Sequence, residues 1–155
     1  MAKSKSAGAG EKTTRAQDEA VWRLLDANAN RAREGLRILE DTARFVLNQA
    51  AHAKGLRALR HALDALTRVH YHRLLSSRDV LNDSGRSNSS GVYPGGVADL
   101  LAANFKRCAE ALRVLEEYGK VLSPQAVHTL QKIRFEIYDY EKKLAGQDRG
   151  KEFKK

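Results

Sequence analysis

Apolar residues recur at helical spacing along four segments of this chain. The first segment runs from residue 18 to about residue 49, and the second from about residue 53 to residue 76. A third runs from about residue 97 to residue 122, and a fourth continues to about residue 144. No segment alternates apolar and polar residues for long enough to form a strand, so the pattern predicts an all-α fold.

Breaks in this pattern mark the expected ends of the helices. Residues 77–96 are rich in Ser, Asn, Asp and Gly, which predicts a loop that is long for a compact domain. Ser123 followed by Pro124 is typical of an N-cap and a first helical residue. Within the first segment, Gly35 is the only glycine and proline is absent.

The first helical segment is repeated in the third at an offset of 76 residues. The matched apolar residues are Val21, Leu24 and Leu25 with Val97, Leu100 and Leu101, and the matched polar residues are Asn28, Arg31 and Glu34 with Asn104, Arg107 and Glu110. The second and fourth segments are similar at an offset of 74, as Arg60 and Arg134 illustrate. The repeat therefore predicts a four-helix bundle built from two repeated helical hairpins joined by the long loop.

Three polar residues recur in both halves of the repeat. On a helical wheel Asn28 falls inside the apolar stripe, while Arg31 and Glu34 lie on its flank. A buried polar group without a partner costs about 1–3 kcal/mol, so the repeated asparagine favours a polar site between the two halves. The alternative is a structural network in which Arg31–Glu34 and Arg107–Glu110 form ion pairs that fix the helix register.

Further candidate residues lie on the second segment and on the loop. His61 sits among leucines, where a lone histidine is commonly a hydrogen-bonded core residue. Arg78, Asp79, Asp83 and Arg86 place acidic and basic side chains on a Gly-containing segment, which suits a lid over phosphates and Mg²⁺; the alternative is a flexible connector. No metal-binding His/Cys pattern and no nucleotide-binding glycine motif occurs in the sequence.

Composition narrows the class of protein. The chain has 155 residues, with 28 Lys+Arg against 19 Asp+Glu and a formal net charge of +9. This length excludes a TIM barrel and suits one domain, with residues 1–16 expected to be a disordered tail, residues 17–145 the helical bundle and residues 146–155 a basic tail. A single cysteine excludes an intrachain disulfide, and no apolar run is long enough to span a membrane, so we expect a cytoplasmic protein.

The positive charge raises nucleic-acid binding as an alternative function. A nucleic-acid-binding protein of this kind would carry its basic residues on one exposed stripe with accessible aromatic side chains. Here the basic residues are dispersed or lie in the tails, and Trp22, Phe45, Phe105 and Phe135 are predicted to make core or hairpin contacts. We therefore do not expect nucleic acid to be the partner.

Four strings of residues are distinctive. They are LDANANRAREGLRILED at 25–41, LRH at 59–61, SRD at 77–79 and ANFKRCAEALRVLEEY at 103–118. Together they resemble the helical domain found at the N-terminus of some bacterial thiamine-phosphate synthases, which is described as an alternative hydroxymethylpyrimidine phosphate kinase. The resemblance implies transfer of a phosphoryl group from ATP, with Mg²⁺, to a pyrimidine monophosphate in thiamine biosynthesis.

The resemblance also suggests roles for the candidate residues. Arg31, Arg107 and Asp79 are the expected catalytic residues, and Arg78 and Lys106 are expected to bind phosphate. The expected substrate-binding residues are Asn28, Asn104, Glu34, Glu110 and His61, and the expected Mg²⁺ ligands are Asp79 and Asp83. Because the nucleophile is a phosphate oxygen with a second pKa of about 6, the reaction needs positive charge and in-line positioning more than a general base.

A non-catalytic role is the main alternative to the kinase. In that case the helical domain docks on a separate thiamine-phosphate synthase and channels or senses the pyrimidine. An apolar seam left exposed on the bundle would also favour a homodimer. Incubation with ATP, Mg²⁺ and the monophosphate separates the two readings, since only a kinase makes the pyrophosphate.

Overall fold

All the regular elements in the described part of the chain are helices. The computed structural model describes residues 7–82 and 91–146, and it describes side chains from residue 14 onward. The elements are α1 (Ala7–Asp41), the π-helical turn η1 (Thr42–Val46), α2 (Ala50–Arg68), α3 (Tyr71–Ser76), α4 (Val97–Leu122) and α5 (Pro124–Leu144). The predicted all-α fold is therefore confirmed.

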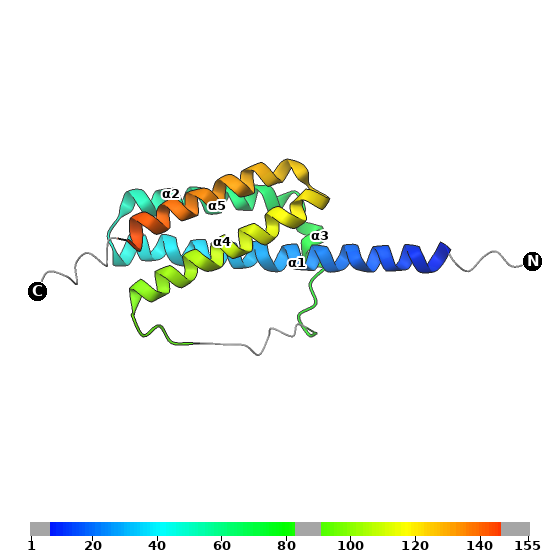
Figure 1. Ribbon diagram of the computed structural model, residues 1–155, viewed down its shortest axis with the longest axis horizontal. Coiled ribbons are helices and arrows are strands. Elements are labelled where there is room, and N and C mark those ends of the chain that lie inside the picture. Colours follow the sequence, from blue (N-terminus) through cyan, green and yellow to red (C-terminus); the bar gives the residue numbers. More distant parts are fainter. Residues whose placement is uncertain (1–6, 83–90, 147–155) are drawn as a thin grey trace, which may run out of the picture.

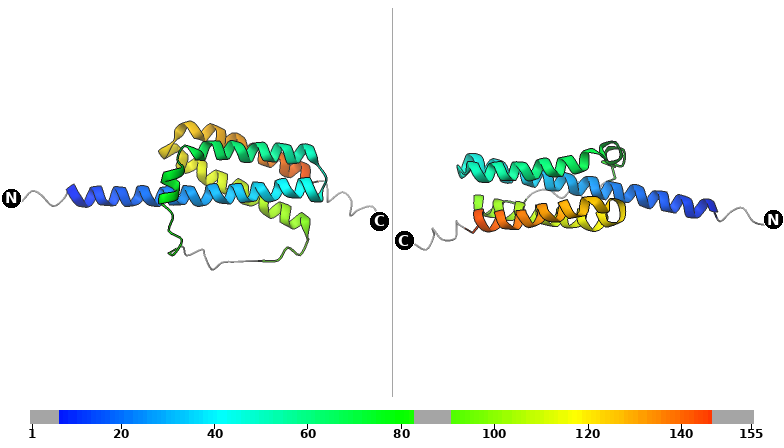
Figure 2. Two further views of the ribbon diagram at one scale, coloured as in Figure 1. Left: turned by 180° about the vertical axis from the view of Figure 1, so that it is seen from behind. Right: turned by 90° about the horizontal axis from the view of Figure 1, so that it is seen from above.

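The four long helices pack as two antiparallel pairs (Figure 1). Helix α1 packs against α2, α4 packs against α5, and the two pairs meet through contacts of α1 with α4 and of α2 with α5. The two further views show the same arrangement, with the first part of α1 extending beyond the bundle (Figure 2). The short α3 lies across one end, against α1.

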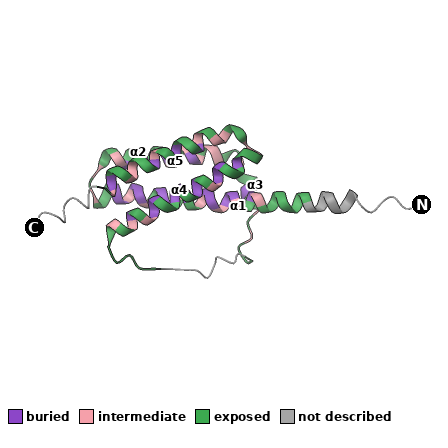
Figure 3. Cartoon of the chain, in the orientation of Figure 1, coloured by how far each residue is buried: buried purple, intermediate pink, exposed green. Residues whose placement is uncertain are grey.

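The apolar stripes of the four helices face one another and form one core. Buried residues line the inner faces, whereas the outer faces are exposed (Figure 3). Leu36, Leu56, Leu112 and Ile137 each come from a different long helix, and all four are fully buried. Because burial of one such side chain contributes about 1.5–3 kcal/mol, this shared core is the main term that holds the helices together.

The first helix ends earlier than its sequence pattern predicts. The α-helix stops at Asp41 and continues only as the π-helical turn, in which the Leu47 N–H donates to the Thr42 carbonyl oxygen at 3.0 Å. Asn48 then adopts a φ of 53°. Asparagine tolerates this left-handed conformation better than most residues, so it ends the helix and turns the chain into α2.

The second predicted helix is two helices. It breaks at Val69 and His70, and α3 begins at Tyr71. The break allows Leu74 to become buried and brings the His70 ring to 5.1 Å from the ring of Trp22. Tertiary packing of these side chains therefore decides the change of direction.

The first helix begins earlier along the chain than its sequence pattern predicts. Helix α1 begins at Ala7, within the segment expected to be a disordered tail, while residues 1–6 and most of the basic tail lie outside the described residues. Helices α4 and α5 have the predicted bounds, with Pro124 as the first residue of α5. Ser123 occupies the N-cap position, but its side chain makes no capping hydrogen bond.

Helices α1 and α4 approach closely at matched positions of the repeat. Cys108 Sγ lies 3.5 Å from the backbone oxygen of Ala32, and these two residues are separated by the repeat offset of 76. A Cβ atom on Gly35 would lie 2.5 Å from Cys108 Sγ. Gly35 is therefore explained by this crossing, where a side chain would not fit.

Two of the four aromatic residues do not make the contacts predicted for them. Trp22 and Phe105 are buried as expected, but Phe45 is 65% exposed and Phe135 is 57% exposed. Phe45 lies in the π-helical turn, and Phe135 packs edge-on against Tyr138 at the surface of α5. Accessible aromatic residues are thus present, and that part of the argument against nucleic-acid binding does not hold.

None of the helices in the described part of the chain is both long and apolar enough to cross a bilayer.

Candidate functional site

The two repeated asparagines are buried and make the same hydrogen bond. Asn28 Nδ2 donates to the Leu24 carbonyl oxygen at 2.9 Å, and Asn104 Nδ2 donates to the Leu100 carbonyl oxygen at 2.8 Å. Each amide thus satisfies a donor within its own helix. The Asn104 Oδ1 atom also accepts a hydrogen bond from Arg107 Nη1 at 3.4 Å.

The two repeated arginines flank the crossing of α1 and α4. Arg31 and Arg107 each precede a residue of the Ala32–Cys108 contact, and both are exposed. Neither forms an ion pair with the glutamate three residues further on, as far as the described residues go. The alternative prediction, in which Arg31–Glu34 and Arg107–Glu110 form ion pairs, therefore does not match the described residues. Both guanidinium groups remain accessible on the surfaces of their helices.

An open cleft of about 620 Å³ lies between α1 and the segment that follows α3. Four of the predicted site residues line it, namely Asn28, Arg31, Arg78 and Asp79. Four polar residues that were not predicted from the sequence also line the cleft, namely Arg23, Asp26, Asn30 and Asn82. Its charged groups are three arginines and two carboxylates, so the cleft has a small positive excess and suits an anionic ligand.

Asp26 anchors the segment after α3 to α1. Its side chain is buried, with a relative exposure of 5%, and it accepts hydrogen bonds from Arg78 Nε at 2.6 Å and Arg78 Nη2 at 3.0 Å. The hydrogen bond to Asp26 raises the pKa of the Arg78 guanidinium above its ordinary value. This two-point pairing fixes the plane of the guanidinium group beside the cleft.

A chain of hydrogen bonds continues from Asp26 to helix α2. Asn30 Nδ2 donates to Asp26 Oδ2 at 3.3 Å, and Arg33 Nη2 donates to Asn30 Oδ1. Arg33 Nη1 then donates to Asp64 Oδ1 at 3.1 Å. The position of Arg78 is thus connected to the α1–α2 hairpin by successive side-chain contacts.

Asp79 makes the second tie between the same segment and α1. Its Oδ2 atom lies 3.4 Å from Arg23 Nη1, and its carboxylate accepts hydrogen bonds from the backbone N–H and the side-chain amide of Asn82. The hydrogen bonds from Asn82 lower the pKa of the Asp79 carboxyl, so it is ionised at neutral pH. An exposed, ionised carboxylate at the edge of an arginine-lined cleft can contribute one oxygen to a hydrated cation.

The remaining predicted site residues lie elsewhere. Glu34 lines a shallow hollow with Arg33, Arg37, Ile38 and Arg60, whereas Lys106 and Glu110 line a hollow between α4 and α5. Lys106 Nζ lies 3.9 Å from Glu110 Oε1, in an exposed pair. His61 is exposed on α2, so it is not the core residue expected from its apolar neighbours. Asp83 lies outside the described residues.

A metal cage made of protein ligands alone is not present in the described part of the chain. No group of three or more His, Cys, Asp or Glu side chains gathers there in a way that could hold a metal ion. Mg²⁺ does not require such a cage, because it keeps several waters and is commonly bound by one or two carboxylates together with substrate phosphates. Asp79 is the better placed of the two carboxylates of the cleft, because its side chain is 33% exposed whereas that of Asp26 is 7% exposed and bound by Arg78 at both oxygens.

The residues missed from the sequence are those that differ between the two halves. A comparison of the two halves indicates only positions that carry the same residue in both. Asp26 corresponds to Ala102 and Asn30 corresponds to Lys106, so neither position stands out. Helical spacing gave no signal for Asp26, because this residue falls on the side of the helical wheel that also carries Arg33 and Arg37. Its partner lies 52 residues away in a loop, at a distance that no helical periodicity reports.

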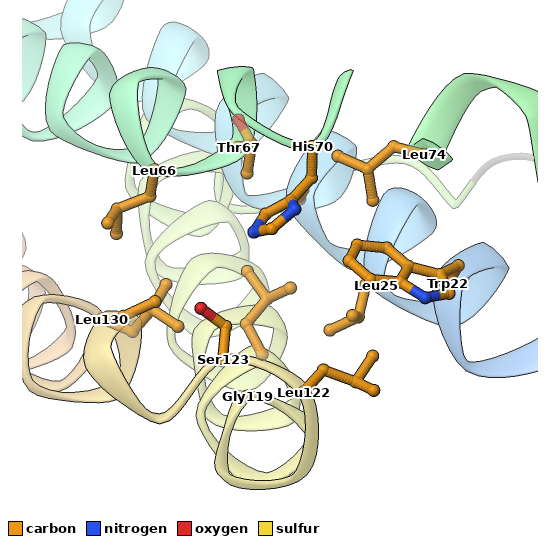
Figure 4. Close-up of a pocket in the computed structure, with 13 residues that line it drawn as sticks. Trp22, Leu25, Leu66, Thr67, His70, Leu74, Gly119, Leu122, Ser123 and Leu130 are labelled. Carbon is orange, nitrogen blue, oxygen red and sulfur yellow. The ribbon is translucent and has the colours of Figure 1, made fainter. Parts of the chain in front are cut away.

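A second cavity lies inside the bundle and has a different character (Figure 4). It is lined mainly by apolar side chains, with Trp22, His70, Leu25 and Leu130 around it, and its volume is about 60 Å³. A water molecule needs at least about 10–15 Å³ of such volume, so this space suits a few waters and is too small for a nucleotide. The open cleft is therefore the better candidate site.

The chain is similar to curated thiamine-phosphate synthases. It is 39% identical over 133 residues to that of Nostoc punctiforme, covering 84% of this chain and 37% of the relative. The corresponding values are 41% over 133 residues, 84% and 38% for Synechocystis sp., and 39% over 140 residues, 86% and 37% for Rhodopirellula baltica. The chain thus spans less than two fifths of the length of these relatives.

No solved structure shows a significant match to this chain. The model of the ThiD2 family matches residues 23–143, a range that begins at Arg23 of the cleft and ends within the last turn of α5. Most of the chain is covered by this match, which includes the second half of α1 and nearly all of the other three long helices. The chain therefore belongs to the ThiD2 family.

Proposed function

We propose that this protein acts in thiamine biosynthesis and phosphorylates hydroxymethylpyrimidine phosphate to the pyrophosphate, with ATP as the phosphoryl donor. The observation that carries the proposal is the cleft in which three arginines, Arg23, Arg31 and Arg78, lie beside the amide groups of Asn28 and Asn30. Membership of the ThiD2 family and the similarity to thiamine-phosphate synthases support the assignment to this pathway.

The residues of the cleft suit phosphoryl transfer. In the proposed reaction an oxygen of the substrate monophosphate attacks the γ-phosphorus of ATP, and the bond from that phosphorus to the oxygen of ADP breaks. Arg31 and Arg78 stabilise the charge on the transferred group. Arg107 lies on α4 and is not among the residues that line the cleft, so its part in the reaction stays a prediction from the sequence. Asn28 offers its Oδ1 atom to the pyrimidine, because its Nδ2 atom already donates to Leu24.

Magnesium is the metal that the proposed reaction requires. Asp79 is the described residue that suits it, as one carboxylate ligand to an ion held mainly by phosphates and water. When bound, Mg²⁺ neutralises negative charge on the phosphate oxygens of ATP. The protein's own residues then have the tasks of holding both phosphates in line and keeping their charge compensated.

A direct test is to incubate the purified protein with ATP, Mg²⁺ and hydroxymethylpyrimidine phosphate. We expect the pyrophosphate product, and we expect Asn28→Ala to lose most of the turnover while remaining folded by circular dichroism. Absence of product from the wild-type protein would reject the kinase. Full activity of both Asn28→Ala and Arg31→Ala would reject the proposed site while leaving the reaction intact.

A second candidate is a non-catalytic module that binds the pyrimidine phosphate for a thiamine-phosphate synthase. It is favoured by the relatives, which bear the name of the synthase and of which this chain matches less than two fifths. The same incubation separates the candidates, provided that binding of the monophosphate is measured by calorimetry alongside it. Binding without product, together with association with a thiamine-phosphate synthase, would indicate the non-catalytic module.

A further inference from the structure

Arg78 lies on a segment that has no regular helix to hold it. Arg78 follows Ser77, the C-cap residue of α3, and the Arg78 side chain is 40% exposed. An arginine in such a position ordinarily samples many rotamers, because its long side chain has a high rotamer entropy. Here two of its nitrogen atoms are bound by one buried carboxylate, that of Asp26.

The pairing leaves part of the guanidinium group available. A guanidinium has five N–H donors in a fixed plane, and Asp26 engages only the edge formed by Nε and Nη2. No hydrogen bond to Arg78 Nη1 is found among the described residues. Because Arg78 lines the cleft together with Arg31 and Asn28, its second edge is available to an oxyanion there.

We propose that Asp26 is a positioning residue, which orients Arg78 so that the free edge of its guanidinium binds a phosphate group of the substrate or of ATP. This inference rests on the proposed function, since it names the residue that prepares the same cleft. Asp26 itself does not contact the ligand, because Arg78 and Asn30 occupy its oxygens. Its effect on binding is exerted entirely through Arg78.

The two halves of the repeat support this role. The position matched to Asp26 is Ala102, and the position matched to Asn30 is Lys106. Helix α4 therefore lacks a carboxylate that could hold a loop arginine in the same way. The Asp26–Arg78 pair is a property of the first half alone, as expected of a specialised site rather than of the shared hairpin.

The test uses inorganic pyrophosphate as the probe and the full chain at low ionic strength, with affinity measured by calorimetry. We expect Asp26→Asn to weaken pyrophosphate binding by about 10- to 100-fold, the loss typical when the residue that orients a ligand-binding group is changed. Arg78→Lys keeps the positive charge but loses the fork, and we expect a similar loss. This second variant lies on an exposed segment, so it is informative even if Asp26→Asn does not fold.

A control variant separates positioning from stability. Glu40 is another buried carboxylate of α1 that pairs with arginines, and it lies about 21 Å further along the helix at 1.5 Å per residue. We expect Glu40→Gln to lower the melting temperature but to leave pyrophosphate affinity within about twofold of wild type. The double variant Asp26→Asn/Arg78→Ala should bind no more weakly than Arg78→Ala alone, because Asp26 acts only through Arg78.

Three results would overturn the positioning role. They are unchanged pyrophosphate affinity in Asp26→Asn, a further loss in the double variant, and absence of pyrophosphate binding by the wild-type protein. The proposed reaction is judged separately, by turnover of the monophosphate. If pyrophosphate binding depends on Asp26 but the protein does not turn over the monophosphate, the kinase is rejected and the positioning role is supported. If the protein turns over the monophosphate but its pyrophosphate binding does not depend on Asp26, the kinase is supported and the positioning role is rejected.

Discussion

Gly35 illustrates how a single residue is decided by a contact far away in the sequence. In an isolated helix a glycine costs about 1 kcal/mol relative to alanine. The backbone of α1 is so close to α4 at this point that a Cβ would lie 2.5 Å from Cys108 Sγ and 3.4 Å from the backbone oxygen of Asn104. The glycine is therefore retained for packing and not for flexibility.

We expect Gly35→Ala to destabilise the protein, because the overlap with Cys108 costs about 1–3 kcal/mol and outweighs the gain in helix propensity. In a Cys108→Ala background the sulfur is gone, and the same change should then be neutral or stabilising. Urea unfolding of the four proteins measures both effects. A stabilising Gly35→Ala in the wild-type background would contradict the close approach of α1 and α4.

The buried thiol of Cys108 should make the free energy of unfolding depend on pH. Burial raises the pKa of its thiol from an ordinary value of 9.0 to about 12. The unfolded chain therefore ionises first as the pH rises above about 9, and folded-state stability falls by up to about 1.4 kcal/mol per pH unit until the pH approaches 12. Unfolding free energies between pH 9 and 11 should show this loss, and Cys108→Ala should show a smaller one.

At the scale of elements, each hairpin is fastened by one buried glutamate. Glu40 of α1 is fully buried and binds Arg57 at 2.7 Å and Arg60 at 3.0 Å, both on α2. Glu116 of α4 is 2% exposed and binds Arg134 of α5 through both oxygens, at 2.5 and 3.0 Å. Glu40 and Glu116 occupy matched positions of the repeat, so the two hairpins are stabilised by the same kind of buried ion pair.

We expect Glu40→Gln and Glu116→Gln each to destabilise the protein by about 3–5 kcal/mol, since removal of one partner leaves a buried or half-buried arginine without its counter-charge. Asp41→Asn is the control, because its pair with Arg37 is exposed and contributes only about 0.3–0.5 kcal/mol. Thermal and urea unfolding measure the differences. Equal, small effects at all three carboxylates would contradict the role of the buried pairs.

The ends of the helices show where a local sequence pattern is sufficient to predict the structure. Helix α4 matches its predicted bounds because Gly96, with a φ of 65°, and the Asp99 side chain, which accepts the Gly95 N–H at 2.7 Å, define its start locally. The break between α2 and α3 was not predicted, because it depends on the burial of Leu74 and the contact of His70 with Trp22. Contacts between elements are not recorded in helical periodicity.

At the scale of the whole molecule, the antiparallel crossing of α1 and α4 brings matched residues of the two halves near one another. Arg31 and Arg107 flank this crossing, although they are 76 residues apart in the chain. Arg37 and Arg113 are matched in the same way but are paired with Asp41 at 2.9 Å and with Glu117 at 2.7 Å. The repeat thus offers one pair of candidate arginines and one pair of controls.

We expect Arg31→Ala to lower turnover of the monophosphate by about 100-fold, the order of loss found when one group that stabilises transition-state charge is removed. Arg107→Ala should have a smaller effect, because Arg107 is not among the residues that line the cleft. Arg37→Ala and Arg113→Ala should remain close to wild type, because each of these arginines pairs with an acidic residue on the surface of its own helix. Steady-state assays of the four variants make the comparison. Equal losses in all four would indicate a general effect of surface charge instead of a site at the crossing.

The sequence by itself determined the all-α fold, the positions of α4 and α5, and the repeated Asn, Arg and Glu positions, because each of these depends on spacing along one helix or on the similarity of two segments. Only the tertiary structure decided that Asp26 meets Arg78, that Glu34 and Asn28 line different surfaces, and that Gly35 meets Cys108. These contacts join residues of separate elements or separate faces of one helix. They are set by how the helices pack in three dimensions, which periodicity along the chain does not specify.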